Sequence, residues 1–277
     1  MKFTKRRVER IYPTFLAVFG LYLVLSILFP MKNKIHGDFH QAGIYILENL
    51  FLLPGMFHIA PIVTVAWSLS YEFAFYLSLP ILVWAIQMRR WEGVFRFVFL
   101  LSTWVLLGLA TPSINNERIR MISFLAGVVL YELTKLALKQ RLLTTWGELG
   151  SIIFVLLCFT FFYVSTVYGP TIKFSPALLY FPLTVGLFFL TLYSFEFSGI
   201  LQKFFSWDPL RFLGSMSYSY YLIHGITLEG VSVGMGILRV PKVSLAGVLA
   251  EHIIGFAASW ISASALFFLI ERKYSLK

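Results

Sequence analysis

The chain alternates long apolar runs with short polar segments. Five runs contain no Asp, Glu, Lys or Arg, and they cover residues 11–31, 97–116, 149–172, 174–195 and 253–270. A helix needs about 20 apolar residues to cross roughly 30 Å of hydrocarbon, so these runs are long enough to span a membrane. Only a helix satisfies its own backbone hydrogen bonds in lipid over such lengths.

Three further apolar stretches contain isolated ionisable residues: 61–88 with Glu72, 119–138 with Glu132, and 212–233 with His224 and Glu229. The pattern predicts an all-α membrane protein, a polytopic bundle of about eight transmembrane helices that forms one domain over residues 1–277. The expected spans are approximately 13–31, 63–87, 97–113, 119–138, 149–168, 176–195, 212–233 and 247–270.

One connection contains an apolar stretch of its own. Residues Ala42 to Phe57 form a mainly apolar stretch that is interrupted by Glu48 and by Pro54-Gly55. A ninth span here would invert every later loop. We therefore predict a half-helix or surface-lying segment over the outer mouth of the bundle, which lipid tolerates where such an element is buried in protein.

Charge supports an even number of spans. Of the 23 Lys and Arg residues, 16 fall in the segments that eight spans place in the cytoplasm and 7 fall outside. This bias toward the inner side predicts that both termini are cytoplasmic. The chain is 58% hydrophobic and 13% charged, against about 25% charged in soluble proteins.

The net charge of +10 is accounted for by basic loops beside anionic membrane lipids, and we expect no nucleic-acid partner. The sequence contains no recognisable metal-ligand cluster, phosphate-binding glycine loop or nucleophile elbow.

Ionisable residues inside a bilayer are costly and indicate function. On the second expected span, Ser68, Glu72 and Tyr76 recur at i, i+4 and i+8, so a carboxylate shares one helix face with a hydroxyl and a phenol. On the seventh expected span, Ser217, Tyr220, Tyr221 and His224 form a second polar stripe.

At a rise of ~1.5 Å per residue, Glu72 lies ~9 Å and His224 ~12 Å below the outer boundary of the hydrocarbon, so the two side chains can meet. A carboxylate that orients an imidazole can support acid-base catalysis. Interhelical hydrogen bonding without catalysis stays open for both residues.

Arg7 and Arg10 are i, i+3 neighbours at the start of the first helix. A guanidinium binds anionic oxygens with two parallel hydrogen bonds, which suits a ligand that carries phosphate. A topology signal bound to lipid head groups is the alternative for this pair.

Five segments in order resemble the acyltransferase-3 family of bacterial membrane acyltransferases. They are RRVERIYP from Arg6, WSLSYEFAFYL from Trp67, RMISFLAGVVLYEL from Arg120, LRFLGSMSYSYYLIHGI from Leu210 and LFFLIERKYS from Leu266. The resemblance implies an O-acyltransferase of the inner membrane. Such an enzyme moves an acyl group, commonly acetyl, from cytoplasmic acyl-CoA to a hydroxyl of a surface glycan or lipid-linked sugar.

With the resemblance, we expect Glu72 and His224 to be catalytic. Acyl-CoA is expected as donor substrate, with no permanently bound cofactor. The residues expected to bind substrate are Arg7, Arg10, Trp67, Ser70, Tyr76, Ser217 and Tyr221.

The chain departs from the family pattern at its start. The family has two spans before the RxxR segment, and the first carries a histidine regarded as the catalytic base. No residue here corresponds to that histidine, so we expect weak or no transferase activity from this chain alone. A transporter or flippase of acyl-bearing or lipid-linked molecules and a non-catalytic membrane subunit are the alternatives.

Overall fold

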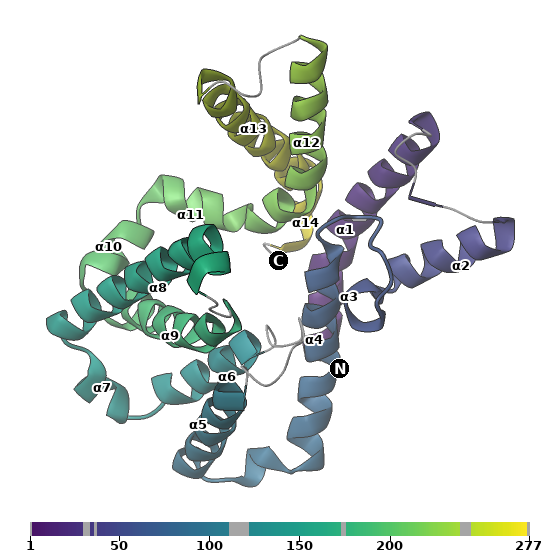
Figure 1. The fold of residues 1–277 in the computed structure, drawn as a ribbon. Coiled ribbons are helices and arrows are strands. Elements are labelled where there is room, and N and C mark those ends of the chain that lie inside the picture. The colour runs from purple at the N-terminus through teal and green to yellow at the C-terminus, as the bar shows by residue number, and fades with distance from the viewer. Residues whose placement is uncertain are drawn as a thin grey trace. The chain divides into compact units, whose positions relative to one another are not determined.

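The computed structural model describes residues 2–29, 34–35, 38–110, 122–172, 176–238 and 245–275. These residues form helices and connecting loops, without a strand among them. The chain divides into two compact units, Met1–Ser78 with Phe212–Lys277 and Leu79–Arg211. Figure 1 shows the helices along the chain.

The helices of the first unit are α1 (Lys2–Leu28), α2 (Phe39–Leu50), α3 (Pro54–Phe57), most of α4 (Ala66–Ala85), α12 (Ser217–Ile237), α13 (Leu245–Leu266), a π-helical turn (Phe267–Glu271) and α14 (Arg272–Ser275). Those of the second unit are α5 (Gly93–Ala110), α6 (Ile122–Thr134), α7 (Leu138–Leu142), α8 (Thr145–Ile172), α9 (Tyr180–Glu196) and α10 (Ile200–Phe205), with 3-10 turns at Met88–Arg90 and Pro176–Leu179. Helix α11 (Asp208–Ser215) crosses the boundary between the units.

Within these residues, five helices are long and apolar enough to cross a membrane: Thr4–Leu28, Ala66–Ala85, Gly93–Ala110, Thr145–Ser165 and Gly247–Tyr274. Helices α6, α9 and α12 lie over the other three expected spans. The described part of α6 has 13 residues and α9 has 17. Parts of the expected spans at 30–31, 111–113 and 119–121 lie outside the described residues. A multi-pass helical membrane protein is therefore established, while the count of eight and the side of the termini stay predictions.

The core of the first unit is built on one face of α1. Phe15 and Val18 are fully buried there, and Phe19 follows on the same face. They pack against Leu69 of α4 and Leu222 of α12. Because residues at i, i+3 and i+4 share a helix face, this apolar stripe fixes which side of α1 meets its neighbours.

Helix α12 lies beside α13 in the same unit (Figure 1). The N-terminus of α12 has no cap from its own sequence. Glu271, which is 1% exposed, supplies one from the π-helical turn: its Oε2 accepts hydrogen bonds from the Ser219 backbone N–H at 3.0 Å and from the Ser219 hydroxyl. The carboxylate satisfies an N–H that a helix end otherwise leaves without a partner.

The expected break between Ala42 and Phe57 is present. Helix α2 ends at Leu50 and α3 begins at Pro54. The Asn49 amide holds α2 to the segment before α4, because its Oδ1 accepts from the Ile62 N–H at 2.7 Å. With 12 residues α2 is too short to cross ~30 Å, which agrees with the predicted half-helix.

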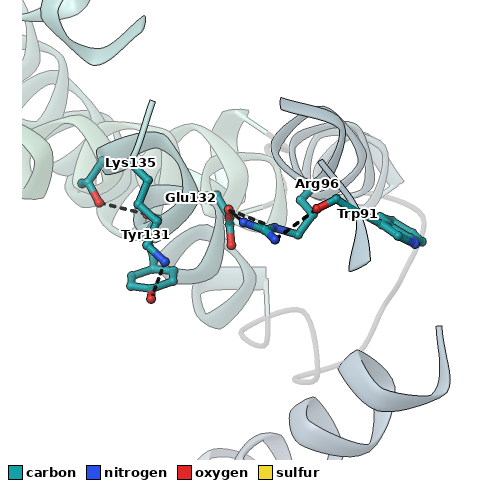
Figure 2. A network of polar contacts seen from close by, with 6 residues as sticks. Trp91, Arg96, Tyr131, Glu132 and Lys135 are labelled. Carbon is teal, nitrogen blue, oxygen red and sulfur yellow. Dashed lines mark hydrogen bonds and ion pairs between the residues drawn. The ribbon is translucent and has the colours of Figure 1, made fainter. Parts of the chain in front are cut away.

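In the second unit, Arg96 of α5 binds Glu132 of α6, the ionisable residue of the fourth expected span. Its Nε and Nη2 lie 3.2 Å and 3.1 Å from Glu132 Oε2, and Nη1 donates to the Trp91 carbonyl (Figure 2). Both side chains are mostly buried. The Arg96 guanidinium thus compensates the charge of the Glu132 carboxylate, which is costly to bury without a partner.

Another buried glutamate of this unit, Glu148, caps a helix. Glu148 of α8 is 1% exposed, and its Oε1 accepts from the Leu201 N–H at 2.7 Å, at the start of α10. Gly199 precedes α10, and a Cβ there would collide with the Glu148 carboxylate. The close approach of the carboxylate to the backbone accounts for glycine at this position.

Candidate active site

The first unit contains a cavity of about 520 Å³ where α1, α4 and α12 meet. Three segments far apart in sequence line it: Arg7, Arg10 and Ile11 from α1, Ser68, Glu72 and Tyr76 from α4, and Ser217, Tyr218 and Tyr221 from α12. Six of the nine residues expected to be functional are among them. The regular helical spacing on α1, α4 and α12 directs each set toward one point.

Glu72 forms the acidic part of the wall on α4. The Tyr76 hydroxyl donates a hydrogen bond to Glu72 Oε1 from one turn further along the helix. The Arg7 guanidinium lies over the Tyr76 ring, 4.8 Å from its centre. Tyr76 therefore links the positive charge of Arg7 to the negative charge of Glu72.

Two phenols of α12 hold the cavity walls together. The Tyr221 hydroxyl donates to the Val65 carbonyl at 2.6 Å and is bonded to the Ser68 hydroxyl on α4. Since a phenol has one hydrogen and Val65 receives it, Ser68 is the donor to Tyr221. The Tyr218 hydroxyl donates to the Ile11 carbonyl on α1 at 2.9 Å, so α12 is tied to both neighbours.

Trp67 and Ser70 do not line the cavity. Ser70 is buried, and its hydroxyl accepts from the Gly55 N–H at 3.2 Å and donates to the Ala66 carbonyl. Trp67 packs edge-on against Tyr71. These contacts give both residues a packing role beside α3, and their expected contact with substrate stays a prediction.

His224 lies one turn beyond Tyr221 on α12, and it is not part of the cavity lining. Its ring stacks on Tyr220 with an interplanar angle of 5°, and Nδ1 lies 2.7 Å from the Tyr221 carbonyl. A carbonyl only accepts, so Nδ1 carries the proton and Nε2 of the neutral ring is an acceptor.

The described residues contain no hydrogen bond between Glu72 and His224. The Glu72 carboxylate accepts from Tyr76, whereas the His224 imidazole is oriented by a backbone carbonyl. The Tyr221 carbonyl therefore orients the His224 imidazole, a role that the sequence analysis gave to the Glu72 carboxylate.

Two positions that build the candidate site escaped the sequence reasoning. Tyr218 lines the cavity, and its i, i+3 spacing from Tyr221 within the same polar stripe is the signal that could have identified it. Glu271 positions the start of α12, on which Ser217 and Tyr218 lie, and a cap supplied by a segment 52 residues away leaves no local sequence pattern.

The fold and the cavity define a class of protein, a multi-pass helical membrane protein with arginines, a carboxylate and phenols around a common cavity. A family model described as an acyltransferase domain, the acyltransferase-3 model, matches residues 1–270. The chain belongs to this family and is a membrane acyltransferase. No curated protein and no solved structure matches it significantly.

Proposed function

We propose that the protein transfers an acyl group, in the first instance acetyl, from cytoplasmic acyl-CoA to a hydroxyl of a surface glycan or lipid-linked sugar. The observation that supports this most strongly is the cavity that combines Arg7 and Arg10 with Glu72. An acyl-CoA donor carries phosphates and a thioester on one flexible molecule, so it needs cations and a protonatable group around one space.

In this proposal, Arg7 and Arg10 bind the phosphates of coenzyme A, and the pantetheine arm enters the cavity. Guanidinium groups suit phosphate because their hydrogen bonds are charge-assisted and bidentate. The arginine end of α1 then faces the cytoplasm of a bacterial inner membrane, as the bias of Lys and Arg toward the expected inner segments favours.

The reaction exchanges a thioester for an ester. The acceptor oxygen attacks the thioester carbonyl, its proton passes to a base, the bond from carbon to sulfur breaks, and the coenzyme A thiolate takes up a proton. We assign the base to Glu72, since its carboxylate lines the cavity. This proposal replaces the expectation of weak or no transfer, which rested on the absence of a counterpart to the family's histidine. His224 Nε2, one turn beyond Tyr221, is the second acceptor available to the proton.

The donor site is tested by equilibrium binding of acetyl-CoA to the purified full chain. We expect Arg7→Ala with Arg10→Ala to weaken binding by about 100-fold or more, because hydrogen bonds to charged groups contribute ~1.5–3 kcal/mol each. Arg6→Ala is the matched control, since Arg6 lies on the same turn, is exposed and does not line the cavity. Equal affinity in the double variant and the wild type would remove the donor assignment.

A further inference from the structure

The second unit contains a groove of about 370 Å³ between α8 and α9, which lie side by side (Figure 1). Its lining residues are Gly147, Gly150, Ser151 and Phe154 of α8, Val185, Gly186, Phe189 and Tyr193 of α9, and Leu142 at the end of α7. On each long helix the lining residues recur about once per turn, so one face of α8 and one face of α9 are turned to this space.

The polar side chains in the groove are engaged by the protein itself. The Tyr193 hydroxyl donates to the Leu142 carbonyl, and the Ser151 hydroxyl donates to the Glu148 carbonyl at 2.7 Å. A hydroxyl has one hydrogen, so neither side chain has a donor left for a ligand. The other lining residues are apolar or glycine. The interior of the groove therefore suits a hydrocarbon chain.

Two glycines of α8 shape the groove. A Cβ on Gly150 would meet no atom within 4 Å, and this residue is exposed, so the groove is open along this part of the helix. A Cβ on Gly147 would collide with the Tyr193 hydroxyl, so glycine there lets the phenol close the end beside Leu142. From Gly147 to Phe154 the groove extends about 10 Å, which fits within the ~15 Å that one leaflet contributes to the hydrocarbon.

The Leu142 end of the groove has the features of a membrane interface. The candidate span Thr145–Ser165 begins at this end. Trp146 in its first turn is 83% exposed, and tryptophan is enriched at the level of lipid head groups. The groove therefore extends from the head-group level into the hydrocarbon.

The charges at this end favour an anionic ligand. Lys139 of α7 is neutralised by Glu196 at 2.6 Å, and Glu148 is 1% exposed and accepts from the backbone of α10. Arg141 of α7 and Lys203 of α10 are exposed, and neither forms an ion pair with another residue that the structure describes. A guanidinium beside an apolar groove matches a molecule that combines a phosphate with an acyl chain.

We propose that this groove binds one anionic phospholipid, with an acyl chain lying against Phe154, Val185 and Phe189 and a phosphate that accepts hydrogen bonds from Arg141. The groove belongs to the second unit and shares no lining residue with the candidate active site. The inference therefore does not depend on the assignment of donor or acceptor.

The test uses phosphatidylglycerol that carries a photoreactive diazirine in one acyl chain. It is added as a trace to phosphatidylcholine nanodiscs that contain the purified full chain, and labelled residues are mapped by mass spectrometry. We expect labelling at residues 147–154 and 185–193 that excess unlabelled phosphatidylglycerol suppresses. Phosphatidylcholine with the same diazirine should label these residues about tenfold less, because its choline compensates the phosphate charge.

Gly150→Leu fills the groove and should reduce labelling by the phosphatidylglycerol probe about tenfold. Gly127→Leu is the matched control, because Gly127 is an exposed glycine of α6 in the same unit, has open space at its Cβ and does not line the groove. Leucine is a better helix former than glycine, so neither change weakens its helix.

Arg141→Ala tests the charge without changing the groove. We expect labelling by the phosphatidylglycerol probe to fall to the level of the phosphatidylcholine probe, because a charge-assisted hydrogen bond is lost. Arg89→Ala removes another exposed arginine of the second unit and should leave the labelling unchanged.

Equal labelling of the wild type by the two probes would overturn the inference, since it would show ordinary bilayer contact without selection. Unchanged labelling in Gly150→Leu or in Arg141→Ala would also overturn it, as would an equal loss in Gly127→Leu. If the wild type is a dimer in nanodiscs that Gly150→Leu dissociates, a second copy of the chain fills the groove and the lipid assignment is wrong.

Discussion

Two buried carboxylates in this protein act as helix caps. Glu271 binds the start of α12, and Glu148 binds the start of α10. Both are 1% exposed, and each interacts with backbone N–H groups at a positive helix terminus. Glu271 Oε1 is buried and has no hydrogen-bond partner among the residues that the structure describes, where Oε2 alone holds this side chain.

Glu271 caps a helix that lines the candidate site, whereas Glu148 caps a helix of the other unit, which gives a test at the residue scale. Glu271→Gln should lower the thermal unfolding temperature and also weaken acetyl-CoA binding about tenfold, since a tenfold change corresponds to ~1.4 kcal/mol. The reason is that Ser217, Tyr218 and Tyr221 follow directly on the capped end of α12 and line the cavity.

Glu148→Gln is the control, because it removes the same charge from a buried cap in the other unit. We expect a lower unfolding temperature with unchanged acetyl-CoA affinity. If both variants change the affinity equally, Glu271 has no positioning role for the site.

Residue spacing predicted part of this site. The i, i+4, i+8 pattern of Ser68, Glu72 and Tyr76 and the pair Arg7 and Arg10 all lead to one cavity. Trp67 and Ser70 belong to the same sequence motif, yet their neighbours are Tyr71 and Gly55. A motif contains both reactive and packing residues, and helix periodicity alone does not say which partner each face meets.

At the scale of elements, α3 packs closely on α4. A Cβ on Gly55 would collide with the Trp67 carbonyl and lie 3.2 Å from Ser70 Cβ. Because the obstacle is backbone, it cannot rotate away. Glycine at this position lets α3 pack directly on the first turns of α4.

Gly55→Ala should therefore displace α3 and cost ~1–3 kcal/mol of stability, as overpacking commonly does. The control is Gly43→Ala in α2, where a Cβ meets nothing within 4 Å. That change should be neutral or stabilising by up to ~1 kcal/mol, because alanine favours helix. Unfolding temperatures in one detergent compare the variants, and equal temperatures for the two would contradict the close contact.

The sequence pattern predicted the existence of elements better than their extent. The break before Pro54 was predictable, since apolar periodicity stops there and proline begins α3. The Arg96–Glu132 ion pair was not, because Glu132 reads only as an isolated charge in an apolar run. Pairing between α5 and α6 depends on helix packing that hydropathy does not encode.

At the scale of the whole molecule, membership of the acyltransferase-3 family and a multi-pass helical fold agree with the sequence interpretation. The first unit alone combines residues from both ends of the chain, Met1–Ser78 and Phe212–Lys277. The candidate active site lies in this unit, and the proposed lipid groove lies in the other.

The central claim is that Glu72 carries the proton in acyl transfer within the α1–α4–α12 cavity. The most direct test is transfer of radiolabelled acetyl from acetyl-CoA to an octyl glucoside acceptor by the purified full chain in proteoliposomes. Glu72→Gln should bind acetyl-CoA with wild-type affinity. Its rate of acetyl transfer should fall by about 100-fold or more, which is the usual contribution of a general base. Equal transfer rates for Glu72→Gln and the wild type would contradict the account.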